Sequence, residues 1–372
     1  MNNILNRTNS FLLLLVLSTV ALYFGQPLLV PLFLGALFAM LMAPLCRRMD
    51  KRLPRGVSSL ICTVIVMVSL LTILAVGAWQ IAVFVEDIPR IKERSTELLS
   101  SIQKFVEESF SISREKQKSM VQKQLTSLSE VMSSYAGKML GSAASTITFI
   151  VLALLFTFLF LYNKERYEAF FVKLFKNEEP ARIKSIVAKI SQVSEQYLLG
   201  RTYSIVILFV CYTIGLLIIG IKNALLLAAV ASLLTIIPYV GTIVGSIFPV
   251  AMALISEDSL QPVIWTGAIM IVIQAIDNYF IEPYVVGGEV NLSAMATILI
   301  IVCGGLIWGV AGTILFIPLL GIVKIVCDNV EPLKPYGFLI GDPAGNKPSK
   351  VKTWLQNTFK KGEGARSKKT SK

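Results

Sequence analysis

Four polar residues near the end of an apolar stretch have the spacing of one helix face. Gln274, Asn278 and Glu282 follow one another at intervals of four residues, and Asp277 lies beside them. A carboxylate deep in hydrocarbon costs at least about 2.5–3.5 kcal/mol on insertion scales, so it usually faces a cavity or a partner. The stripe therefore suits coordination of a cation or proton, or hydrogen bonding to a polar solute. Glu282 could instead lie at the headgroup boundary, where Pro283 ends the span.

Two apolar segments that contain proline and glycine flank this stripe. An Ile-Pro-x-x-Gly pattern covers Pro238, Tyr239 and Gly241, and it recurs 80 positions later around Pro318, which suggests an internal repeat. Proline removes a backbone donor and clashes with the preceding turn. A broken helix at membrane depth must face protein, water or a ligand, and paired broken helices are the best sequence pointer to a transporter site. We therefore predict that these four residues join the polar stripe in binding a substrate or ion; a proline kink that only shapes packing is the alternative.

Glycines recur in the same apolar segments. Gly241 and Gly245 form one GxxxG pattern, and Gly305 and Gly309 form another, with Gly304 and Gly312 nearby. Small residues at this spacing let helices approach closely. We expect them to serve packing.

Several kinds of chemistry are excluded by residue usage. The chain has no histidine, so a Ser-His-Asp or Cys-His catalytic unit cannot be built. Its five cysteines include no CxxC pair, which argues against structural zinc and disulfides. No GxxxxGK[ST] loop occurs, which argues against ATP as the energy source. We predict a protein that is not an enzyme and that uses no cofactor and no metal.

Membrane residence follows from how the apolar residues are distributed. Hydrophobic residues make up 55% of the chain and charged residues only 16%, and long uncharged segments recur that can each cross about 30 Å of hydrocarbon. An even number of spans puts the main basic clusters on one side, as the positive-inside bias requires. We predict an all-α polytopic membrane protein of about eight transmembrane segments, with both termini cytoplasmic. The apolar runs are 11–25, 27–45, 57–79, 142–162, 203–221, 224–255, 262–281 and 294–327.

The regions between the spans predict further organisation. Residues 121–139 carry a heptad seam, which is typical of a helical hairpin packing on itself outside the membrane but could also join the subunits of a homo-oligomer. The stretch 164–201 is basic and amphipathic, as in a helix at the cytoplasmic interface, and we assign it no chemistry. The predicted regions are N-terminal spans 1–85, an extracytoplasmic helical region 86–140, a span 141–163, a cytoplasmic connector 164–202, a C-terminal bundle with broken helices 203–330, and a basic cytoplasmic tail 331–372.

The net charge of +12 could indicate nucleic acid as a partner. The basic residues lie mainly in short inter-span loops and in the C-terminal tail, which is the pattern of a positive-inside protein. The lipid bilayer is therefore the predicted partner, together with a small polar solute or a monovalent cation or proton, and no nucleic acid.

Taken in order along the chain, these motifs resemble the autoinducer-2 exporter family of bacterial membrane proteins. The resemblance spans nearly the whole chain and is densest from about residue 224 to 340. It rests on Ile237 to Gly241, Asp277-Asn278, Glu282-Pro283, Gly287-Gly288, Asn291-Leu292, the glycine run 304–312, and Ile317-Pro318-Leu319.

The resemblance implies an inner-membrane protein of about eight segments. Members of the family are linked to export of the autoinducer-2 quorum-sensing signal, and others to sodium(lithium)/proton antiport, with higher oligomers also implied. Three functions therefore stand: a secondary exporter of a small polar solute such as autoinducer-2, a sodium(lithium)/proton antiporter, and a non-transporting oligomeric membrane scaffold.

Overall fold

The protein is α-helical throughout the part of the chain that the computed structural model describes, residues 2–110, 143–175, 179–238, 240–256, 261–286 and 292–342. In these residues the only strand-like pairing is an isolated bridge between Leu292 and Gly341. The predicted all-α class is confirmed. The helices are α1 (Asn2–Phe24), α2 (Gln26–Met49), α3 (Arg55–Phe110), α5 (Ala143–Tyr162), α6 (Lys164–Leu174), α7 (Pro180–Ile219), α8 (Ala224–Leu234), α9 (Val240–Ser256), α10 (Gln261–Ile276), the π-helix η1 (Asp277–Val286), α11 (Ala294–Asn329), the 3₁₀ helix η2 (Glu331–Leu333) and α12 (Lys334–Ile340).

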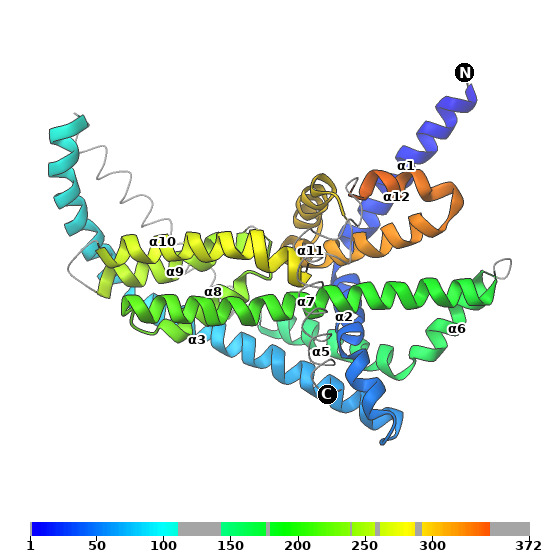
Figure 1. Ribbon diagram of the computed structural model, residues 1–372. Coiled ribbons are helices and arrows are strands. Elements are labelled where there is room, and N and C mark those ends of the chain that lie inside the picture. The colour runs from blue at the N-terminus through cyan, green and yellow to red at the C-terminus, as the bar shows by residue number, and fades with distance from the viewer. Residues whose placement is uncertain are drawn as a thin grey trace, which may run out of the picture.

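Helix α7 organises the bundle. It runs across the width of the molecule, with α8, α9 and α10 along one half and α2, α5 and α6 along the other (Figure 1). One hydrophobic core lies between α7, α8, α9, α10 and η1. A second core joins α2 to α11, and a third joins α2, α3 and α5.

Five helices are long and apolar enough to cross a membrane within the described residues, and a sixth span arises if α5 and α6 are taken together. These are fewer than the eight predicted apolar runs. Two predicted runs account for the difference. Residues 11–25 lie in α1, which is not among these helices, and residues 224–255 form two short helices instead of one span. Multiple apolar helices of spanning length nevertheless make the chain a multi-pass membrane protein.

Helix α3 is far longer than a membrane is thick. Its 56 residues reach about 84 Å, against about 30 Å of hydrocarbon. Only Arg55–Gln80 has the composition of a span. The predicted boundary between residues 85 and 86 falls inside this continuous helix, and the predicted heptad seam at residues 121–139 lies outside the described residues.

Residues 224–256 form a helical hairpin rather than one kinked span. Helix α8 ends in tight turns, in which Ile237 N–H donates to the Leu234 carbonyl, and Pro238 follows, which has no N–H to extend the helix. A Cβ added at Gly241 would overlap the Leu234 carbonyl, and one at Gly245 would lie 3.1 Å from the Ala231 Cα. From Gly241 to Gly245 the chain advances along α9, while the contacted residues step back along α8 from Leu234 to Ala231. The chain therefore reverses between the two helices. At about 16 and 25 Å, neither helix crosses the hydrocarbon alone.

Helix α11 also folds back on itself. Gly309 has φ 59° and ψ −140°, a backbone conformation that glycine adopts without the steric cost of a Cβ. This residue divides α11 into two legs. A Cβ on Gly304 would lie 2.6 Å from the Gly312 carbonyl, although residues eight apart in a straight helix are about 12 Å distant. The legs form separate coils near the α11 label in Figure 1.

The tip of this second hairpin is anchored in the protein. Trp308 is 2% exposed, and its indole N–H donates to the Leu22 carbonyl of α1 at 2.8 Å. Its ring lies edge-on to Phe316, with 5.0 Å between ring centroids. The prediction that Pro318 breaks the helix is wrong, since Pro318 lies inside the second leg and the break is at Gly309. The predicted repeat fails for the same reason, because Pro238 lies in a turn and Pro318 does not.

Candidate functional site

The predicted polar stripe lies where α10 changes to a π-helix. Helix α10 ends at Ile276, and Asp277 begins the ten-residue π-helix η1. π-Helical turns are rare and are often found at functional sites. In η1, Asp277 and Ile281 are buried, whereas Asn278 and Glu282 are exposed. The i→i+5 turn of a π-helix places Asp277 and Glu282 one turn apart, and Glu282 is the more exposed of the two.

Asp277 is held against α7. Its side chain is 2% exposed, and the Ser204 hydroxyl donates to its Oδ1 at 3.3 Å. Arg201 lies three residues before Ser204 on α7, and its guanidinium interacts electrostatically with both Asp277 and Glu282. The charge of one arginine thus acts on two carboxylates that belong to consecutive turns of η1. Such a group can stabilise a bound anionic or polar ligand, or exchange places with a bound cation.

A second set of hydrogen bonds links α7 to α10 and to the start of η1. The Tyr212 hydroxyl donates to Gln274 Oε1 at 3.4 Å, and Gln274 Nε2 donates to Asn278 Oδ1 at 3.1 Å. Hydroxyl and amide groups can act both as donors and as acceptors. Together with Asp277 they supply the mixed hydrogen-bonding surface that a small polar solute requires.

The remaining predicted residues occupy other places. Pro238 and Gly241 shape the turn of the α8–α9 hairpin, and Pro318 lies in the second leg of α11. Tyr239 lies outside the described residues. The geometry therefore brings together Gln274, Asp277 and Asn278, and the hydrogen bonds of their side chains lead to α7 rather than to the proline segments.

The α7 side of the site was not predicted from the sequence. Arg201, Ser204 and Tyr212 are spaced so that they lie on one face of α7, with the buried Leu208 between the last two. This polar face within an apolar run is the signal that could have identified them. Among the residues the structure describes, no cluster of three or more cysteine, aspartate or glutamate side chains is arranged to hold a metal ion.

The fold defines a multi-pass α-helical membrane protein with buried polar groups between two of its helices. Residues 12–331 match the profile of the AI-2E family transporters, and the chain belongs to that family. The chain is therefore a member of a transporter family.

Individual relatives resemble the chain over nearly its whole length. "Putative transport protein YhhT" of Escherichia coli K12 is 24% identical over 344 residues, covering 90% of this chain and 95% of the relative. "Putative transport protein YueF" of Bacillus subtilis is 22% identical over 351 residues, covering 87% and 91%. "AI-2 transport protein TqsA" of Escherichia coli K12 is 22% identical over 334 residues, covering 88% and 94%.

Proposed function

We propose that this protein is a secondary transporter that exports a small polar solute, such as the autoinducer-2 signal, across the bacterial inner membrane. The observation that carries the proposal is the buried Asp277 carboxylate, bonded to Ser204 of α7 inside a π-helical segment. A buried carboxylate in a membrane span is retained where it serves a substrate or ion path. The name of the relative TqsA supports autoinducer-2 as the first solute to test.

Gln274, Asp277, Asn278 and Glu282 form the proposed binding surface, with Arg201, Ser204 and Tyr212 on the facing helix. The amide and hydroxyl groups would hydrogen-bond the solute, and Asp277 would couple its movement to a cation or proton. Pro238, Tyr239, Gly241 and Pro318 remain proposed contributors through the shape of the two hairpins. Both chain termini are proposed to be cytoplasmic, which a reporter fused to either end can test.

Purified protein in proteoliposomes tests the proposal directly. Labelled autoinducer-2 should cross the membrane faster in proteoliposomes than in protein-free liposomes when a proton or sodium gradient is imposed. Equal rates in both would contradict export of this solute. The same vesicles, loaded with a pH-sensitive dye, report sodium- or lithium-driven proton movement.

A sodium(lithium)/proton antiporter is the second candidate function. It is favoured by two carboxylates, Asp277 and Glu282, that share the charge of one arginine, since cation exchange needs acidic groups that can bind either ion. Cation-driven proton movement without solute transport would select this function. A protein that moves neither would instead be the oligomeric scaffold proposed from the heptad region.

A further inference from the structure

Helix α6 presents an apolar face that is exposed within the described part of the chain. It follows α5 after a bend of 72° at Asn163, directly at the end of an apolar span. This helix is described over its full length, and no residue in it is buried. Phe170 is 55% exposed and Leu174 57%, and Tyr167, Phe171 and Phe175 are exposed as well.

The exposed side chains share one side of the helix. Tyr167, Phe170, Phe171 and Leu174 are spaced by three, one and three residues, which places them on one helical face. Tyr167 also packs on Phe160 of α5, with 5.3 Å between the ring centroids. The aromatic face therefore continues the apolar surface of the span that precedes it.

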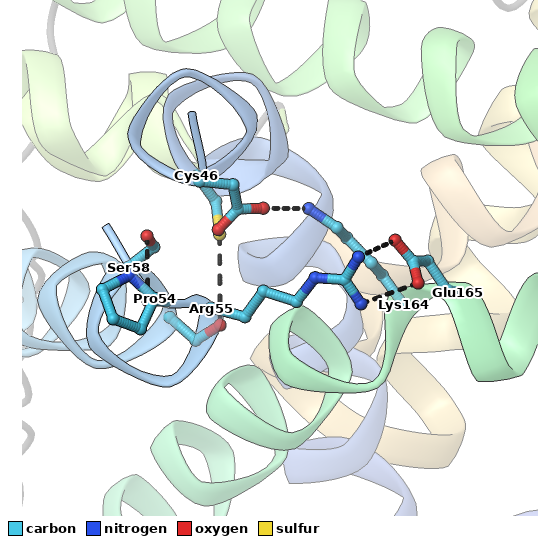
Figure 2. Close-up of polar contacts among 8 residues, drawn as sticks. Cys46, Pro54, Arg55, Ser58, Lys164 and Glu165 are labelled. Carbon is cyan, nitrogen blue, oxygen red and sulfur yellow. Dashed lines mark hydrogen bonds and ion pairs between the residues drawn. The ribbon is translucent and has the colours of Figure 1, made fainter. Parts of the chain in front are cut away.

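Ion pairs at the start of α6 fix how the helix is rotated about its axis. Lys164 Nζ lies 2.5 Å from Asp50 Oδ2, at the end of α2, and Arg55 at the start of α3 pairs with Glu165 at 2.6 Å. Figure 2 shows both pairs bridging the α2–α3 turn and the first residues of α6. Glu165 lies on the side of α6 opposite the aromatic face, so its ion pair with Arg55 turns that face away from the α2–α3 turn.

A hollow lies on the aromatic face, beside the α5–α6 bend. Its volume is about 410 Å³, and it is lined by Asn163, Arg166, Tyr167 and Phe170. The lining combines one guanidinium, an amide, a phenol and an aromatic ring. A guanidinium can bind a phosphate through two parallel hydrogen bonds, while the amide and the phenol can donate to its remaining oxygens.

We propose that α6 lies in the headgroup layer of the membrane and that this hollow binds the phosphate of an anionic phospholipid, with Arg166 as its principal contact. Amphipathic helices with aromatic side chains on one face lie in this way at the membrane surface. A lipid is favoured over a protein partner because the aromatic face is continuous with a membrane span. Tyrosine and other aromatic rings also concentrate at the headgroup level.

Lipid titration of the purified full-length protein tests this site. The thermal unfolding midpoint is measured in a neutral detergent with increasing phosphatidylglycerol, and in parallel with phosphatidylcholine and with inorganic phosphate. Phosphatidylglycerol should raise the midpoint more than either alternative. In Arg166→Gln, the half-saturating phosphatidylglycerol concentration should rise roughly fivefold, as the loss of one basic contact to an anionic lipid predicts.

Matched variants distinguish binding in this hollow from general electrostatic attraction between the basic helix and anionic lipid. Lys173→Gln removes a basic residue of the same helix that does not line the hollow, and it should change the half-saturating concentration less than roughly twofold. The unfolding midpoint without lipid should be the same in Arg166→Gln as in the wild type, because Arg166 is exposed.

Three results would overturn the proposal. The first is a half-saturating phosphatidylglycerol concentration that is the same in Arg166→Gln and the wild type, or one that rises in Lys173→Gln as much as in Arg166→Gln. The second is equal protection by inorganic phosphate, which would make the ligand a free anion. The third is a Phe170→Ser variant that changes the oligomer size while its lipid response stays the same, which would assign the face to contacts between proteins.

Discussion

The two helical hairpins, α8–α9 and the folded α11, reverse the chain by different means. In the first, the turns that follow α8 at residues 235–238 include Pro238, whereas in the second the reversal occurs at Gly309 and leaves Pro318 inside a helical leg. The Ile-Pro-x-x-Gly pattern occurs in both and marks the turn in only one. What the hairpins share is glycine where the legs touch, Gly241 against Leu234 and Gly304 against Gly312. Close contact between the legs, rather than proline, is therefore the common requirement.

The largest expected effect comes from adding a methyl group between the legs. In Gly312→Ala the Cβ would overlap the Gly304 carbonyl, and in Gly241→Ala it would overlap the Leu234 carbonyl. Neither neighbour is a flexible side-chain end, so each variant should lose about 3 kcal/mol of stability, the upper part of the range for overpacking. The thermal unfolding midpoint in detergent measures the loss.

Gly267→Ala is the matched control, because no atom lies within 4 Å of the added Cβ. Its midpoint should stay the same or rise slightly, since alanine favours a helix. Equal midpoints for Gly267→Ala, Gly312→Ala and Gly241→Ala would refute the close approach of the legs in both hairpins.

The next largest effect concerns the backbone at the second reversal. Gly309→Ala places a side chain in a conformation with φ 59° and ψ −140°, which should cost about 1–3 kcal/mol. The added Cβ meets no atom within 4 Å, so the loss reports backbone strain alone. Gly77→Ala, which is equally free of contacts but lies within a regular helix, provides the comparison. A midpoint for Gly309→Ala that matches Gly77→Ala would mean that the reversal does not depend on glycine.

A smaller effect is expected at the α2–α6 corner, which charge rather than close packing holds together. Burial raises the pKa of Asp50, but the hydrogen bond and the charge of Lys164, with hydrogen bonds from Ser58 and Cys46, outweigh it and lower the pKa below the ordinary 3.8. The pair thus stabilises the fold above about pH 4 and loses this contribution as the pH falls through the lower folded value. Asp50→Asn should cost about 1 kcal/mol at neutral pH.

Unfolding midpoints of the wild type and of Asp50→Asn, followed from pH 7 toward pH 3, check this sign. The difference between them should be constant near neutrality and shrink only at the acid end. A difference that grows as the pH falls would contradict the lowered pKa.

The smallest effect is expected for Pro318→Ala. Pro318 lies inside the second leg of α11, nine residues beyond the reversal, so its removal should leave the hairpin intact and change stability by less than about 1 kcal/mol. A loss larger than that of Gly309→Ala would restore proline as the residue that shapes the second hairpin. Unfolding midpoints of the two variants, measured side by side, decide between them.

The sequence predicts the helical class well because apolar runs report directly on burial and membrane residence. It predicts that residues 224–255 are broken at Pro238, but not that the chain reverses there. The reversal depends on a contact between Gly241 and Leu234 across the turn, and such a contact leaves no periodic signal. In α11 the glycine-rich segment predicts close packing; the contact is between Gly304 and Gly312 on the two legs of the same helix, and Gly309 forms the reversal itself.

The candidate site is predictable on one side only. Gln274, Asp277 and Asn278 stand out because polar residues are rare in an apolar run, and the structure links them by hydrogen bonds to Tyr212 and Ser204. Arg201, Ser204 and Tyr212 form a polar face on α7 that is visible in the sequence, but the sequence does not indicate which helix that face meets. Only tertiary packing brings Ser204 within hydrogen-bond distance of a residue 73 positions away.

Transport by Asp277→Asn in proteoliposomes tests the role of the buried carboxylate most directly. The substitution keeps the size of the side chain and removes its charge, so the transport rate should fall roughly tenfold or more and its dependence on the driving cation should change. Glu331→Gln, which changes an exposed carboxylate paired with Lys334 outside the spans, should transport at the rate of the wild type. A rate and cation dependence in Asp277→Asn that equal those of the wild type would remove Asp277 from the mechanism.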